Sequence, residues 1–136
     1  MIYFVTPTLY SAGEKMLITM LVDGLFKSNV LTRGNVKRSK PKKIDIKYAK
    51  ELLRTGEYTL IDVRSPSEYN EDHIIGAHLI PCDELETRIK ELNPNNKYIV
   101  ICRSGNRSTK ACDILTKHGF QFVYNIDGGM NQWYES

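Results

Sequence analysis

The sequence predicts an α/β fold built on a parallel β-sheet. Short apolar stretches rich in β-branched residues, typical of buried strands, alternate along the chain with longer amphipathic stretches typical of helices. Residues that begin and end helices stand between these stretches. A helix that links two strands carries the chain back to the same end of the sheet, so the alternation favours parallel pairing. The length of 136 residues fits one main domain.

The first predicted helix covers Ile46–Arg54. Asp45 precedes it as a capping residue, and Gly56 closes it, which is the usual chemistry of helix ends. The apolar stretch Tyr58–Val63 follows directly and predicts a buried strand.

A short helix and a second strand come next. Ser65 or Ser67 is expected to cap a turn of helix that runs through Tyr69. The stretch Ala77–Ile80 then predicts a short strand, which Pro81 stops.

A third helix is predicted over Asp83–Leu92, because its apolar residues recur on one helical face, and Asn93-Pro94 ends it. The run Tyr98–Cys102 is the most apolar and β-branched of the chain. It therefore predicts a central strand of the sheet.

The last elements repeat the same alternation. A helix is predicted over Ser108–His118, with Gly119 in the position that commonly follows a helix end. Phe122–Ile126 predicts the final strand, and Gly128-Gly129 turns the chain into a helix around Trp133.

The first 43 residues differ in composition from the rest. Residues 1–43 hold eight Lys or Arg and two acidic residues, a net charge of +6, whereas residues 44–136 have a net charge of −3. We therefore predict a basic N-terminal extension over residues 1–43, with one short amphipathic helix over Met16–Phe26, and a domain over residues 44–136. The run Lys37–Lys43 is expected to be a solvated linker rather than a nucleic-acid site, since no aromatic residues are interleaved with it.

Composition also excludes several classes of protein. No uncharged apolar run reaches the roughly 20 residues that span a membrane, so we expect no membrane span. The first residues lack the cationic start of a signal peptide, which favours a cytoplasmic location with reduced thiols. The three cysteines and three histidines show no ligand spacing, so no metal site is expected.

Cys102 is the strongest candidate for chemistry. Ligands of open α/β sheets bind beyond the carboxyl ends of the strands, and Cys102 ends the central strand. The small polar loop after it leads into a helix, whose N–H groups and dipole favour a thiolate there. Arg103 and Arg107 add positive charge, and such surroundings lower the pKa of a thiol.

Residues 44–136 resemble a single rhodanese domain, a sulfurtransferase module. The resemblance rests on four segments in the family's order: Ile61–Arg64 with Glu68-Tyr69, Tyr69–Ala77, Cys102–Ser108, and Asp127–Gly129 with Trp133. It departs from the family at Ile75, where Pro is usual, and at Met130, where an aromatic is common. The resemblance implies a rhodanese-like five-stranded parallel sheet with helices on both faces.

Loop length favours sulfur transfer within this fold. The sulfur-transferring members have a six-residue loop, here Cys102–Arg107, whereas phosphatase relatives have a longer Cys-x5-Arg pattern. The resemblance implies a Cys102 persulfide that takes sulfane sulfur from a donor such as thiosulfate, a mechanism for which we expect no metal or organic cofactor. A thiol or cyanide accepts it, and a sulfur-carrier protein is a possible partner. The alternatives are a persulfide carrier or binding module without turnover and, less favoured, a phosphatase or arsenate reductase.

The residues expected at the site have three roles. They are the nucleophile Cys102, the substrate-binding residues Arg103, Ser104, Gly105, Asn106, Arg107 and Ser108, and the supporting residues Asp62, Arg64 and Glu68, expected to form one ion-pair network beside the loop. For His73 we expect a capping or packing role. Cys82 is interpreted as a small buried residue rather than a resolving thiol, and Cys112 as core.

Overall fold

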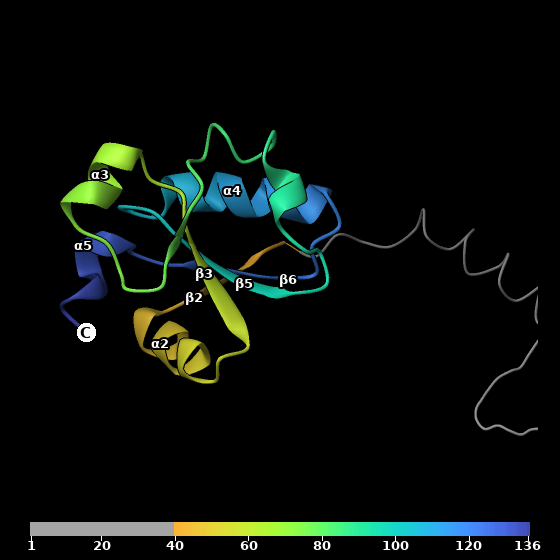
Figure 1. Cartoon of the computed structure of the whole chain (residues 1–136). Coiled ribbons are helices and arrows are strands. Elements are labelled where there is room, and N and C mark those ends of the chain that lie inside the picture. Colours follow the sequence, from red (N-terminus) through yellow and green to blue (C-terminus); the bar gives the residue numbers. More distant parts are fainter. Residues whose placement is uncertain (1–39) are drawn as a thin grey trace, which may run out of the picture. The chain divides into compact units, whose positions relative to one another are not determined.

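The structure is a computed structural model that describes residues 40–136. Within this range the chain forms one five-stranded sheet in the order β2-β6-β5-β3-β4, and all of its strand pairs are parallel (Figure 1). The strands are β2 (Lys42–Ile44), β3 (Tyr58–Asp62), β4 (His78–Leu79), β5 (Lys97–Ile101) and β6 (Phe122–Ile126). The helices are α2 (Ile46–Arg54), α3 (Pro66–Glu71), α4 (Asn106–Lys117) and α5 (Met130–Trp133), with a 3₁₀ turn, η3 (Ile89–Glu91).

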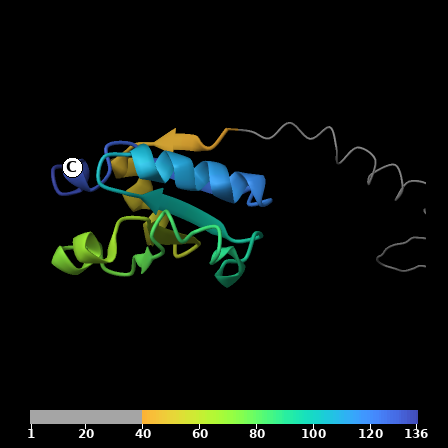
Figure 2. The same cartoon turned by 90° about the horizontal axis from the view of Figure 1, so that it is seen from above.

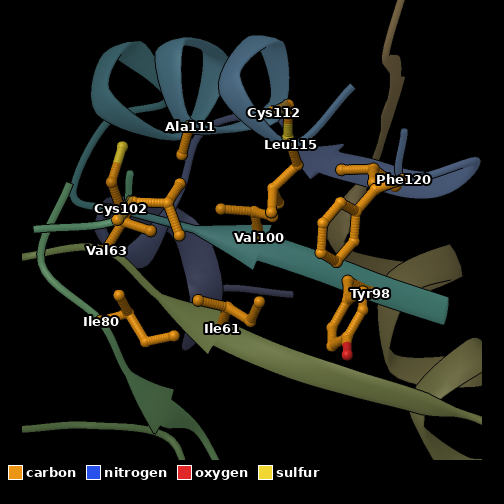
Figure 3. Packing of buried hydrophobic residues seen from close by; sticks show 12 residues of the cluster. Ile61, Val63, Ile80, Tyr98, Val100, Cys102, Ala111, Cys112, Leu115 and Phe120 are labelled. Atoms are coloured by element: carbon orange, nitrogen blue, oxygen red, sulfur yellow. The ribbon is translucent and has the colours of Figure 1, made fainter. Parts of the chain in front are cut away.

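Helices cover both faces of the sheet, as predicted. In Figures 1 and 2, α4 lies over one face and α2 lies under the other. Successive residues of a strand point to opposite faces, so Val100 packs with the α4 side chain Leu115, whereas Ile99 packs with the α2 residue Ala49. Figure 3 shows the cluster on the α4 side, in which Cys102 continues the row of side chains from Tyr98 and Val100.

The sequence pattern did not predict the position of one strand, β2. β2 is a three-residue edge strand whose first two residues are lysines, and its backbone pairs with β6 from Lys42 to Tyr124 through Ile44 to Ile126. Only Ile44 is buried, and both lysine side chains are exposed. Three residues, of which two are solvent-facing lysines, show no alternation of polar and apolar side chains. The positive charge of Lys42 and Lys43 therefore placed them in the expected linker.

The boundary expected after residue 43 falls inside this strand. β2 includes Lys42 and Lys43, so the sheet begins slightly before that boundary. The basic extension itself stays a prediction, because residues 1–39, with the expected helix Met16–Phe26, lie outside the described residues.

The segment Asp83–Leu92 is not the regular α-helix that its pattern predicts. Most of its backbone bonds join residues three apart, as from Glu91 N–H to the Arg88 carbonyl, so it is wound as turns that end in η3. Leu85 is nevertheless buried, and Ile89 and Leu92 pack against the same cluster. The pattern therefore predicted the buried face correctly but not the hydrogen bonding.

Smaller differences concern the ends of elements. β5 ends at Ile101, so Cys102 is the first residue after the strand, and α4 begins at Asn106, two residues before the predicted start. β3 and β4 are shorter than predicted by one and two residues. Among the described residues, no helix has the length and apolar character needed to cross a bilayer.

Candidate active site

Cys102 occupies the carboxyl edge of the sheet. It follows β5 directly, and only 1% of it is exposed. Its side chain points toward α4, at the end of the apolar cluster nearest the start of that helix (Figure 3). A buried thiol at this edge has an apolar wall on one side and the polar loop 103–108 on the other.

The sulfur of Cys102 is surrounded by hydrogen-bond donors of this loop. The backbone N–H groups of Gly105 and Ser108 donate to Sγ at 3.0 and 3.3 Å, and the Ser108 hydroxyl lies 3.4 Å from it. Gly105 precedes the first residue of α4 with φ 112°, a left-handed conformation that glycine adopts without strain. The turn at Gly105 therefore directs the start of α4, where N–H groups are free, at the sulfur.

These donors lower the pKa of the Cys102 thiol. Burial opposes the charged form, but the hydrogen bonds from the Ser108 side chain and from the backbone of Ser108, Gly105 and Ser104 outweigh it. Burial raises the pKa of Cys112, which lies among apolar side chains, and that of Cys82. Of the three thiols, Cys102 is thus the one whose surroundings most favour the nucleophilic thiolate.

The shape of the loop is fixed from α5. The N–H groups of Met130 and Asn131 donate to the carbonyls of Cys102 and Arg103 at 2.8 and 3.0 Å. Gly129 makes this approach possible, because a Cβ there would lie 2.4 Å from the Cys102 oxygen. Sequence reasoning assigned Gly129 to a tight turn only and missed this contact, since nothing local in the sequence places α5 beside the loop.

Glu68 joins α3 to both loop arginines. It accepts from Arg103 Nε at 2.8 Å and from Arg107 Nη1 and Nη2 at 2.7 and 3.0 Å. The hydrogen bond from Arg107, above all, holds the pKa of the Glu68 carboxyl far below its ordinary range. One carboxylate therefore neutralises part of the positive charge that the sequence predicts beside Cys102.

The expected supporting network consists of two separate clusters. Arg64 and Asp62 form a buried ion pair with a shortest N–O distance of 2.8 Å, and Arg64 also donates to the Asp72 carbonyl at 2.7 Å. Glu68 instead pairs with the loop arginines. The first cluster lies where β3 leads into α3, and only the second contacts the loop.

The remaining predicted residues are placed as follows. The side chains of Ser104 and Asn106 are exposed. Cys82 is partly buried, its thiol lies 3.5 Å from the Arg107 carbonyl, and both residues line a pocket of about 400 Å³ beside the loop. His73 Nδ1 lies 2.9 Å from the Tyr69 carbonyl and its ring stacks on Tyr69, in agreement with a capping and packing role.

The peptide group between Arg107 and Ser108 separates two of the thiols. Its carbonyl accepts from Cys82, and its N–H donates to the sulfur of Cys102. Because these two groups of a trans peptide point in opposite directions, the thiols lie on opposite sides of it. This placement disfavours a resolving role for Cys82. Among residues 40–136, no group of three or more His, Cys, Asp or Glu could hold a metal ion.

Comparison with known proteins gives one family. The family model described as "Rhodanese-like domain" matches residues 45–136. The chain is 34% identical over 91 residues to the thiosulfate sulfurtransferase GlpE of Tolumonas auensis, an alignment that covers 67% of this chain and 86% of that protein.

Two further relatives agree with this match. The chain is 43% identical over 74 residues to the "Putative sulfur carrier protein YrkF" of Bacillus subtilis (strain 168), which covers 54% of this chain but only 40% of that protein. The crystal structure of a rhodanese-related protein from Thermoplasma volcanium superposes with a TM-score of 0.61 at 35% identity, covering 69% of this chain and 91% of that one.

Proposed function

The chain belongs to the rhodanese-like domain family, and from this premise we propose that it is a sulfurtransferase that works through a persulfide on Cys102. The proposed donor is a sulfane sulfur compound such as thiosulfate, and the acceptor is a thiol or, in an assay, cyanide. The observation that carries the proposal is the buried Cys102 sulfur, which receives two backbone N–H donors and faces the Ser108 hydroxyl.

The first proposed step loads the sulfur. The Cys102 thiolate attacks the outer sulfur of thiosulfate, a new S–S bond forms, and the S–S bond of the donor breaks so that sulfite leaves with the electron pair. The N–H groups of Gly105 and Ser108, which donate to the thiolate, also stabilise the anionic persulfide that replaces it. No metal or organic cofactor is needed for this displacement.

The second proposed step unloads the sulfur. A thiolate or cyanide attacks the outer sulfur of the persulfide, takes that sulfur as a new persulfide or as thiocyanate, and returns Cys102 to the thiolate. The two displacements share one covalent intermediate, so we expect ping-pong kinetics. A reducing cytoplasm, our proposed location, keeps the three free cysteines in the thiol form.

Arg103 and Arg107 are proposed to attract the anionic donor. Their side chains are 49% and 40% exposed, so solvent and anions reach them. Because Glu68 binds both, the three side chains together carry a net charge of +1 rather than +2. We therefore expect a moderate electrostatic contribution to donor binding, one that salt weakens.

A second candidate function is sulfur carriage without turnover. The similarity to a relative named as a sulfur carrier supports it, with a carrier partner as donor or acceptor. A phosphatase or arsenate reductase is the least favoured alternative, since Ser108 stands where Cys-x5-Arg would place the arginine.

Mass spectrometry of the intact protein tests the proposal. After incubation with thiosulfate, the protein should gain the mass of one sulfur atom, on the peptide that holds Cys102, and cyanide should remove it and release thiocyanate. Cys102→Ser should not gain the mass, whereas Cys112→Ala should load like the unaltered protein.

The same preparation separates the alternatives. Loading without sustained thiocyanate formation indicates a carrier, and hydrolysis of a phosphate ester or reduction of arsenate indicates the phosphatase class. Sulfur transfer that survives in Cys102→Ser would contradict the assignment of the nucleophile.

A further inference from the structure

The carbonyl of Gly105 accepts more hydrogen bonds than a helical carbonyl usually does. Thr109 donates to it twice, from its N–H at 3.1 Å and from its hydroxyl at 2.7 Å. The Ser108 hydroxyl lies 3.1 Å from the same oxygen. Gly105 is also the residue whose N–H donates to the sulfur of Cys102, so its orientation matters to the site.

The Ser108 hydroxyl has two possible acceptors and only one proton. One acceptor is the Gly105 carbonyl, and the other is the Cys102 sulfur at 3.4 Å. While Cys102 is a thiol, its S–H can donate to the Ser108 oxygen, and Ser108 can donate to Gly105. Once the sulfur is anionic it has no proton to give, so the Ser108 hydroxyl must turn from Gly105 to the sulfur.

Thr109 lowers the free-energy cost of this reorientation of the Ser108 hydroxyl. A distance of 2.7 Å between a hydroxyl and a carbonyl oxygen requires the hydroxyl proton to lie between them. The Gly105 carbonyl therefore keeps two donors from Thr109 after Ser108 leaves it.

The Thr109 hydroxyl in turn sets the orientation of the Asn125 amide. This amide contacts Thr109 Oγ1 at 2.8 Å, and because that hydroxyl already donates to Gly105, the Asn125 atom in contact must be the N–H donor Nδ2. This orientation leaves Asn125 Oδ1 without a partner, the one such buried side-chain atom found within residues 40–136. An amide held with an unpaired buried oxygen calls for an explanation.

We propose that Asn125 and Thr109 are positioning residues that hold the Gly105 carbonyl and thereby release the Ser108 hydroxyl to the anionic sulfur of Cys102. The proposal deepens the proposed function and rests on it for the anionic sulfur as the working form. Asn125 lies on β6 and Thr109 in the first turn of α4. The hydrogen bonds of these two side chains join them to each other and to Gly105, and none of these bonds reaches the sulfur. Both act through Ser108.

Alkylation of Cys102 in the full chain measures the effect without any sulfur transfer. The rate of modification by iodoacetamide is followed against pH on the peptide that holds Cys102, and its midpoint reports the thiolate. In Thr109→Val the hydroxyl is lost at nearly constant shape, so the midpoint should move to higher pH. The rate below the midpoint should fall about three- to tenfold, since a hydrogen bond to a charged group is weakened.

Matched variants separate this effect from a change in the helix. Thr109→Ser should restore the profile. Thr116→Val, which removes the same kind of bond from a Thr hydroxyl to the carbonyl four residues earlier in α4, should leave it unchanged. Asn125→Leu should shift the midpoint in the same direction as Thr109→Val but by less.

The decisive comparison uses Ser108→Ala. In a protein that already carries Ser108→Ala, Thr109→Val should not move the alkylation midpoint further. The Ser108 hydroxyl, which Thr109 is proposed to release, is absent there. An unchanged midpoint in Thr109→Val, or a full shift that persists with Ser108→Ala, overturns the proposal. Failure of the proposed function is a separate result: the unaltered protein then shows the low alkylation midpoint but forms no persulfide.

Discussion

At the scale of single residues, the three cysteines show that surroundings and not residue type set the direction of a thiol's pKa shift. Cys102 and Cys112 are both almost fully buried and belong to the same cluster. Burial alone raises the pKa of Cys112, whereas loop N–H groups and Ser108 reverse that effect at Cys102. The pKa of a buried thiol is therefore lowered here where the chain leaves the sheet and backbone N–H groups are free to donate to the sulfur.

Gly129 lets α5 approach the backbone of the loop after Cys102. We predict that Gly129→Ala abolishes most sulfur transfer and destabilises the protein, because the added Cβ lies 2.4 Å from the Cys102 oxygen and 2.6 Å from the Arg103 oxygen. Backbone atoms cannot turn aside as a side chain can, so the loop must move away from the sulfur. Persulfide loading and thermal unfolding measure the two effects.

Gly76→Ala is the matched control for this prediction. Gly76 also has a positive φ, 87°, but nothing lies within 4 Å of an added Cβ. Gly76→Ala should lower the free energy of unfolding only by the backbone strain, about 1–2 kcal/mol, and the variant should load sulfur like the unaltered protein. Equal losses in both variants would mean that strain, not the close approach to the loop, makes Gly129 necessary.

At the scale of elements, the six-residue helix α3 contributes one carboxylate, that of Glu68, to the surroundings of the loop after Cys102. Glu68 closes the capping box with Ser65 and also binds the two loop arginines. The same side chain therefore caps the start of the helix and connects it to the loop that follows Cys102. It also lowers the net positive charge of the loop that carries Arg103 and Arg107.

We predict that Glu68→Gln lowers the KM for thiosulfate several-fold at low salt. Glutamine keeps the capping box, so α3 should still form. The net charge of Glu68, Arg103 and Arg107 rises from +1 to +2, which attracts the dianionic donor more strongly. The gain should shrink at about 1 M salt, where charges are screened beyond roughly 3 Å.

Glu91→Gln provides the control for this second prediction. Glu91 is also paired with an arginine, Arg88, but it belongs to η3 and not to the site. The KM of the Glu91→Gln variant for thiosulfate should equal that of the unaltered protein. A higher KM in Glu68→Gln would show that Glu68 serves mainly to orient the arginines.

At the scale of the whole molecule, the site is assembled from segments far apart in the chain. Loops that follow β3, β5 and β6 meet at one edge because parallel strands present their carboxyl ends together. Edge strand β2 supports this arrangement from the side, through its pairing with β6 and a bond from Asp127 N–H to the Ile44 carbonyl at 2.9 Å.

We predict that a chain that starts at Lys40 unfolds at a temperature near that of the full chain and transfers sulfur at a similar rate. A chain that starts at Asp45 lacks β2 and the buried Ile44, so its melting temperature should fall by more than about 8 °C. Thermal unfolding of the three proteins decides both points.

Two outcomes would contradict this view. Equal melting temperatures for the two shortened chains would mean that β2 adds little to stability. A Lys40 chain that melts well below the full chain would show that the residues before it stabilise the domain, and the predicted boundary would be wrong.

The sequence by itself predicted most of the layout and a candidate nucleophile, Cys102. Periodicity and capping residues placed α2 and β6 at their observed bounds, and the apolar run before Cys102 identified the central strand. The loop after Cys102 pointed to this edge of the sheet as the candidate site, because the end of a strand, a glycine and the start of a helix are all local signals. These features depend on residues close in sequence, which is why they can be predicted from it.

Only the tertiary structure decided the contacts that shape the site. Glu68 reaches the loop across 35 positions, and Asn125 reaches Thr109 across 16. The approach of Gly129 to Cys102 and the pairing of β2 with β6 span still other parts of the chain. Such contacts follow from how strands are ordered in the sheet and how α3, α4 and α5 pack at its edge. No local pattern records that order, because each partner's residue type is compatible with many neighbours.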